Sequence, residues 1–271
     1  MRWMLAVVVM LGCATQAQAE LHTEPVEYRH GDTVLEGYLA YDSHLEKPGP
    51  GVLVVHEWKG LNEYAKHRAE QLAQLGYTAL AVDMYGKGIQ AKDHEEAAKL
   101  SGIYRSDRQL MRARIQAGLD VLSHHPLVDA RRIGAIGYCF GGTTVLELAR
   151  SGADVAGVVS FHGGLATPSP ASPGTVKARV LVCHGAADSY VSAEEVAAFE
   201  AEMQQAGVEY RLIRYDGAVH SFTVPDAGND SSRGVAYHPE ADRASWEAMR
   251  RFFEEVLGAP SSVAALSTQV E

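Results

Sequence analysis

Three residues that together can perform nucleophilic catalysis occur in order along the chain. Cys139 stands within Gly-Tyr-Cys-Phe-Gly-Gly (137–142), Asp188 follows one later apolar run, and His220 follows the next. A thiol nucleophile needs a base to take its proton, and that base needs a carboxylate to orient it. The order and the spacing therefore predict a catalytic triad of Cys139, Asp188 and His220.

The segment around Cys139 has the pattern of a nucleophile elbow, a tight turn between a strand and a helix. Its glycines permit close backbone contacts, and the helix dipole favours a thiolate at this position. The Phe140 amide would then point at a developing oxyanion. Two other interpretations are simple packing in a tight turn and a phosphate-binding loop, although Thr143 stands where such a loop needs lysine.

Each partner of Cys139 also has a simpler interpretation, because Asp188 could cap a turn and His220 could be an ordinary loop residue. Their joint position after consecutive strands favours the triad. His184 is a rival base, but it precedes the acid, so we expect it to be a packed polar residue. The pair His56-Glu57 lacks the second histidine of the zinc-protease motif, and no metal or cofactor is predicted.

Glu57 follows a buried strand at the rim where Cys139 is expected. It is either a solvated loop residue or part of the site. The amide of Trp58 is the candidate for the second oxyanion donor, because in this kind of site one donor comes from that loop.

Hydrophobic periodicity predicts the elements that position these residues. Continuous or alternating apolar runs predict strands at 26–30, 33–40, 51–56, 78–82, 132–136, 155–160, 179–183 and 208–215. Helical spacing predicts helices at 62–75, 111–122, 143–150, 192–203 and 246–256. The first two strands form an antiparallel hairpin, and the rest imply a mostly parallel sheet with helices on both faces. Such sheets place their sites at the carboxyl ends of the strands.

Composition limits the number of domains and the kinds of partner. The chain has 271 residues, 46% of them hydrophobic and 21% charged, which suits one α/β domain over 20–258. The small, polar segment 259–271 is predicted to be a flexible tail. A net charge of −10 without a basic cluster disfavours nucleic acid as a partner. We expect a small-molecule substrate and a monomer or small homo-oligomer.

The amino-terminal residues 1–19 have the pattern of a secretory signal peptide. Arg2 precedes an apolar run at 3–11, and Ala17-Gln18-Ala19 offers a cleavage site after Ala19. This predicts a periplasmic or secreted protein, and the run is too short to span a membrane. One alternative is a lipoprotein anchored through Cys13, and another is a buried amino-terminal helix.

Without that segment the chain retains two cysteines, Cys139 and Cys183. The predicted topology places them two strands apart, a separation of about 10 Å at the usual strand spacing. A disulfide needs Cα atoms within about 7 Å. Both thiols are therefore expected to be free.

Three motifs resemble the dienelactone hydrolase family: the elbow at 137–142, Val-Val-His-Glu-Trp at 54–58 and His-Ser-Phe at 220–222. The resemblance extends over about 26–257. It implies an α/β-hydrolase fold and a carboxylic-ester or lactone hydrolase that works through an acyl-enzyme without a cofactor. It also implies the triad named above, and a Glu57 that contacts the resting thiol and helps to set its protonation.

The chain departs from the best-known family members in the substrate pocket. Those enzymes hold a substrate carboxylate with two arginines, whereas this chain has Lys87 near one position and Thr223-Val224 at the other. Lysine lacks the planar bidentate fork of arginine. This disfavours dienelactone itself as the substrate. Tyr85, Lys87 and Phe222 are the expected substrate-binding residues.

Two hypotheses about function follow. The first is an exported hydrolase of small esters or lactones with Cys139 as its nucleophile. The second is a non-catalytic binding or redox-responsive protein on the same fold, since an exported thiol is open to oxidation.

Overall fold

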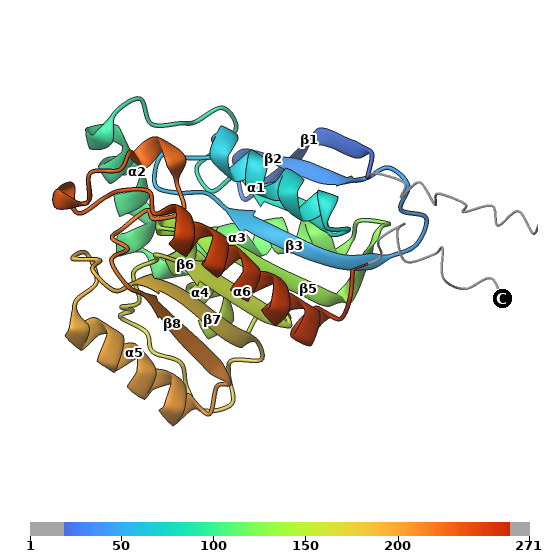
Figure 1. Ribbon diagram of the computed structural model, residues 1–271. Helices are drawn as coiled ribbons and strands as arrows, with labels where there is room; N and C mark the ends of the chain where they lie inside the picture. The colour runs from blue at the N-terminus through green and yellow to red at the C-terminus, as the bar shows by residue number, and fades with distance from the viewer. Residues whose placement is uncertain (1–18, 261–271) are drawn as a thin grey trace, which may run out of the picture.

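The computed structural model describes residues 19–260, which form one eight-stranded sheet with helices on both faces (Figure 1). The strands are β1 (Leu21–His30), β2 (Thr33–Asp42), β3 (Gly49–Val55), β4 (Thr78–Val82), β5 (Val128–Tyr138), β6 (Gly157–Phe161), β7 (Arg179–Gly185) and β8 (Tyr210–Tyr215). Their order across the sheet is β1-β2-β4-β3-β5-β6-β7-β8. Strand β2 runs antiparallel to β1 and β4, and all other neighbouring pairs are parallel.

Six α-helices cover this sheet over the described residues. They are α1 (Glu63–Gln74), α2 (His94–Ser106), α3 (Arg108–Ser123), α4 (Phe140–Arg150), α5 (Ala193–Ala206) and α6 (Pro239–Leu257). Helices α1 and α6 pack on one face, and α2 to α5 contribute to the core on the other. Two short 3-10 turns, Pro225–Ala227 and Ser231–Arg233, lie between β8 and α6.

Strand β3 shows why the chain folds in three layers. Val52 and Val54 pack in the cluster beneath α1 and α6, whereas Leu53 and Val55 pack in the cluster on the opposite face. Successive side chains of a strand point to opposite faces. A strand that is apolar at every position must therefore be covered on both sides, as is usual for parallel sheets.

The predicted fold class is confirmed, as are the hairpin, the parallel strands and five of the helices. Helix α2 was not predicted, because it buries only Ala97, Ser101 and Tyr104 and so carries a weak apolar stripe. Its amino terminus is nevertheless capped by Asp93, whose side chain accepts a hydrogen bond from Glu96 N.

Ser192 and Glu195, at the start of α5, have the spacing of a capping box but form only half of one. Ser192 does cap the helix, since its hydroxyl accepts from Glu195 N at 3.2 Å. The Glu195 carboxylate does not return to Ser192, however. It accepts from Leu165 N and Ala166 N at 2.5 and 2.9 Å, and so fixes the loop that follows β6.

Both ends of the described chain lie at the amino-terminal edge of the parallel strands. Glu20 N donates to Asp42 Oδ1 at 3.1 Å, beside the end of β2 that pairs with the start of β4. At the other end, Arg132, early in β5, donates to Ala259 O at 2.9 Å. The proposed cleavage and lipidation sites within 1–18, and the tail from 261 onward, lie outside the described residues.

Two further expectations concern membranes and disulfides. Between residues 19 and 260, no helix has the length and apolarity needed to cross a membrane. Cys139 and Cys183 are both free, with β6 lying between the strands that carry them, as predicted.

Candidate active site

The topology brings three distant residues to one rim of the sheet. Cys139 directly follows β5, Asp188 follows β7, and His220 follows β8. These strands are parallel, so their carboxyl ends meet at the same edge (Figure 1).

Cys139 occupies a tight turn between β5 and α4, at φ +52° and ψ −109°. The turn requires glycines on both sides. A Cβ on Gly137 would lie 2.0 Å from Gly141 O, and a Cβ on Gly141 would lie 2.2 Å from Val55 O. The predicted nucleophile-elbow geometry is therefore present, and it lifts the thiol above the sheet.

The three side chains form a continuous hydrogen-bonded chain. His220 Nε2 lies 3.0 Å from Cys139 Sγ, and His220 Nδ1 lies 2.9 Å from Asp188 Oδ2. The second Asp188 oxygen accepts from Tyr190 N at 2.9 Å. The structure thus brings together the three residues that the sequence predicted.

The surroundings favour a charged His220. Burial opposes its protonation, but the Cys139 sulfur and the Asp188 carboxylate outweigh this effect and hold the pKa of His220 well above its ordinary value. The second thiol lies in a different environment, since burial raises the pKa of Cys183 to about 12. Of the two cysteines between residues 19 and 260, Cys139 is the one that has a histidine base beside it.

Glu57 lies at the rim where the sequence placed it, but its hydrogen bond is not with the thiol. Its carboxylate accepts a hydrogen bond from Ser221 Oγ at 3.2 Å, whereas the partner of the thiol is His220. The expected contact between Glu57 and the resting thiol is therefore corrected. Burial raises the pKa of Glu57, and the charge of His220 partly offsets that effect.

The two expected oxyanion donors lie on well-anchored backbone. Phe140 opens α4, and the first amides of a helix have no acceptor within it. The Trp58 segment is fixed from below, because Tyr85 Oη donates to Trp58 O at 2.8 Å and His56 Nε2 accepts from Met84 N at 3.3 Å.

The structure does not support the three expected substrate contacts. Phe222 has no exposed surface. Tyr85 is buried, and its hydroxyl is engaged by the Trp58 carbonyl, so it supports the loop and does not face a ligand. Lys87 is exposed but paired with Glu27 and Glu36, at 2.9 and 2.7 Å.

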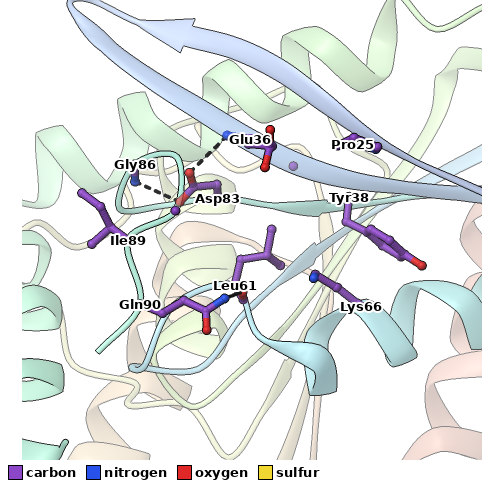
Figure 2. A pocket seen from close by; sticks show the side chains of 11 residues that line it. Pro25, Glu36, Tyr38, Leu61, Lys66, Asp83, Gly86, Ile89 and Gln90 are labelled. Carbon is purple, nitrogen blue, oxygen red and sulfur yellow. Dashed lines mark hydrogen bonds between the residues drawn. The ribbon is translucent and has the colours of Figure 1, made fainter. Parts of the chain in front are cut away.

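Figure 2 shows how the segment that carries Tyr85 is held, at a pocket between β2 and the 83–90 loop. The Asp83 carboxylate accepts from Glu36 N at 3.2 Å and from Gly86 N at 2.9 Å. None of the residues lining this pocket belongs to the Cys139 chain. The pocket therefore lies beside the anchored 83–90 loop and is not part of the catalytic rim.

Sequence reasoning missed His162, Thr223 and Tyr190. His162 is fully buried directly after β6, and its Nδ1 lies 3.1 Å from Cys139 N. Tyr190 is 63% exposed with its ring centroid 5.0 Å from that of His220. The only available signal was position, since all three follow strands that end at the same rim.

Residues with strained backbone conformations are concentrated at this rim. Among residues 19–260, the non-glycine residues with positive φ are Cys139, His162 and Ser221, at +52°, +41° and +56°. Such conformations cost about 1–3 kcal/mol each and persist where surrounding contacts enforce them. No group of three His, Cys, Asp or Glu side chains in the described part of the chain is arranged to hold a metal ion.

The sheet order, the elbow and the ordered Cys-His-Asp chain define the class of α/β-hydrolases. The model of the dienelactone hydrolase family matches residues 35–257, and the chain belongs to that family. Together with the relatives named below, this makes it a hydrolase of carboxylic esters.

Three relatives illustrate the range of the family. A dienelactone hydrolase-like promiscuous phosphotriesterase from metagenomic libraries is 41% identical, with a TM-score of 0.82 over 87% of this chain and 98% of that chain. A probable 2-oxo-3-(5-oxofuran-2-ylidene)propanoate lactonase of Bradyrhizobium sp is 32% identical over 78% of this chain and 86% of its own length. A putative carboxymethylenebutenolidase of Aquifex aeolicus is 26% identical over 86% of this chain and 98% of its own.

Proposed function

We propose that the chain hydrolyses small esters or lactones with Cys139 as the nucleophile. The observation that carries this is the unbroken contact from Cys139 Sγ to His220 and on to Asp188, at 3.0 and 2.9 Å. The contact places a base directly against the sulfur, and the thiolate is the reactive form of a cysteine nucleophile.

The reaction follows from these positions. The Cys139 sulfur adds to the ester carbonyl, and the Phe140 and Trp58 amides stabilise the oxyanion. His220 gives its proton to the departing alkoxide, which leaves an acyl thioester on Cys139. His220 then takes a proton from water, the hydroxide releases the carboxylic acid, and the thiol is restored, while Asp188 holds the ring of His220.

We propose that the preferred substrates carry no carboxylate. Lys87 was the cation expected to attract one, but its charge is compensated by Glu27 and Glu36. Phe222 and Val224, near the other position, are apolar and buried. An anionic ester therefore gains no binding energy from a cation at these positions, and a neutral ester should bind at least as well.

Neutral phosphotriesters are a second candidate substrate class. A relative with 41% identity over 98% of its own length is described as a promiscuous phosphotriesterase. The same thiolate could displace an aryloxide from phosphorus, and water would then have to release the phosphoryl group from sulfur. An aryl phosphotriester should therefore be tested beside a carboxylic ester.

The test compares p-nitrophenyl acetate, a small lactone, an ester with a free carboxylate and paraoxon. We expect Cys139→Ala to lower kcat/KM on the best substrate by at least about 10³-fold, since triad members act as a unit. Cys183→Ala is the matched control, because that thiol has no base, and it should keep its activity. Turnover that survives Cys139→Ala would contradict the proposal. No turnover of any of these substrates by the wild-type protein would favour the non-catalytic binding or redox-responsive alternative.

We also propose that residues 1–19 direct export, with cleavage after Ala19, on the strength of the amino-terminal sequence pattern alone. Expression of the full chain followed by cell fractionation and amino-terminal sequencing tests this. A mature protein that begins at Glu20 supports the proposal. A lipid on Cys13 would support the lipoprotein alternative, and an intact amino terminus in the cytoplasm would contradict both.

A further inference from the structure

A buried chain of hydrogen bonds runs beneath the rim, from the nucleophile to the loop that carries the base. It starts at Cys139 N, which donates to Phe161 O at 3.0 Å and lies 3.1 Å from His162 Nδ1. A backbone N–H can only donate, so His162 Nδ1 must be unprotonated. The proton of this neutral ring is then on Nε2.

The direction of the remaining bonds follows from that assignment. His162 Nε2 donates to Thr223 Oγ1 at 2.8 Å. Thr223 Oγ1 in turn donates to Tyr64 Oη at 2.7 Å, and Tyr64 Oη donates to Thr223 O at 3.1 Å. Each side-chain donor in this series has an acceptor, and the Cys139 N–H is shared between Phe161 O and His162 Nδ1.

Arg68 closes the far end of this chain. Its Nε donates to Tyr64 Oη at 3.2 Å, and its Nη2 donates to Thr223 O at 3.0 Å and to Asp242 Oδ1 at 2.6 Å. Arg68 and Thr223 are both buried. His162 and Thr223 have no exposed surface, so a broken link between them would leave a buried polar group unpaired.

The chain connects two strained segments. Cys139, His162 and Ser221 all have positive φ. Ser221 lies two residues before Thr223. His220 directly precedes Ser221. A shift of Thr223 would therefore move the imidazole that must stay 3.0 Å from the thiol.

We propose that His162 and Thr223 are positioning residues that fix the distance between the Cys139 sulfur and the His220 imidazole. The fully buried ring of His162 links the turn at Cys139 to the loop after β8, which carries both His220 and Thr223. Neither touches the substrate. This inference rests on the proposed roles of Cys139 and His220, and it adds the device that sets their separation.

Burial keeps the His162 ring neutral, with the nearby His220 charge as a smaller cause, so its pKa lies well below the ordinary value. The groups that face it are Cys139 N, Thr223 Oγ1 and the rings of His220 and Phe222. A neutral ring can accept from one side and donate to the other. In a protonated ring, Nδ1 carries a proton and can no longer accept the hydrogen bond from Cys139 N.

The decisive variant is Thr223→Val, which removes the hydroxyl at nearly constant volume. We expect kcat to fall about 10–100-fold with little change in KM, because small misplacements of catalytic groups cost about this much. The rate of Cys139 alkylation by iodoacetamide at pH 7 should fall at least about fivefold, since a displaced imidazole stabilises less thiolate. Thr223→Ser should restore both rates to within about threefold of wild type.

The matched control is Thr78→Val, at a buried threonine in β4 whose hydroxyl has no partner among the described residues. It should leave turnover and alkylation unchanged. Tyr64→Phe is a second variant of the chain, with a smaller expected loss, and it keeps the test informative if Thr223→Val folds poorly. Circular dichroism establishes that each variant is folded.

Wild-type kcat and alkylation in folded Thr223→Val would overturn the inference, as would a loss that Thr223→Ser does not restore. Alkylation needs no substrate, so its outcome is separate from that of the proposed hydrolysis. A protein that turns over no ester, yet whose Cys139 alkylation depends on Thr223, would refute the hydrolysis and support the positioning role.

Discussion

At the scale of single residues, Glu57 is a carboxylate that the fold keeps partly away from water. It is half-buried, and its one hydrogen bond is from Ser221 Oγ at 3.2 Å. Burial favours its neutral form, so its pKa is raised relative to the unfolded chain. The folded state therefore loses stability as pH rises through that raised pKa.

This predicts a pH-dependent effect of Glu57→Gln, which keeps the acceptor for Ser221 and removes the charge. The melting temperature of the variant relative to wild type should be higher at pH 8 than at pH 4. Thermal unfolding followed by circular dichroism at both pH values measures it. A variant that is relatively less stable at pH 8 would show that the ionised carboxylate is well compensated, for instance by His220.

At the scale of elements, the elbow depends on how closely α4 approaches β3. The Cβ of an alanine at Gly141 would lie 2.2 Å from Val55 O, and backbone cannot give way as a flexible side chain can. We therefore expect Gly141→Ala to abolish esterase activity and to destabilise the fold by about 3 kcal/mol or more, as severe overpacking does.

The control is Gly102→Ala in α2, where a new Cβ meets nothing within 4 Å. Alanine is the better helix former by about 1 kcal/mol, so this variant should be more stable than wild type and equally active. Urea denaturation and ester turnover compare the two. An active, stable Gly141→Ala would mean that the elbow can relax without losing its geometry.

The sequence predicted elements and strand ends better than it predicted side-chain directions. Strand β3 was predictable because every position is apolar, and the triad because its members follow such strands. Phe222 and Tyr85 were wrong as substrate contacts, since neighbourhood in a motif does not tell which way a loop side chain points. His162 was missed for a related reason, because only the packed structure shows that its ring reaches Cys139 N.

At the scale of the whole molecule, a buried ionic cluster joins α4 to α5. Arg150 pairs with Glu147 at 3.1 Å and with Glu202 at 2.7 Å, and Arg150 and Glu147 are almost completely buried. Arg150→Met would leave two carboxylates buried with less compensation. We expect a loss of about 3–5 kcal/mol in the free energy of unfolding.

Urea denaturation measures this loss, with Arg131→Met as the control. Arg131 also pairs with an acid, Asp129, but its side chain is 89% exposed. Exposed pairs contribute about 0–1 kcal/mol, so the control should change little. Equal effects of the two variants would show that burial does not determine the strength of the Arg150 cluster.

The position of the two chain ends has a practical consequence for attachment. Glu20 and Ala259 lie at the amino-terminal edge of the sheet, whereas Cys139 follows the far end of β5, a strand of 11 residues. Arg132, which donates to Ala259 O, lies seven residues before Cys139, so at about 3.3 Å per residue the two edges are roughly 23 Å apart. A protein tethered through either end, to a lipid, a bead or a fusion partner, would present its catalytic rim outward.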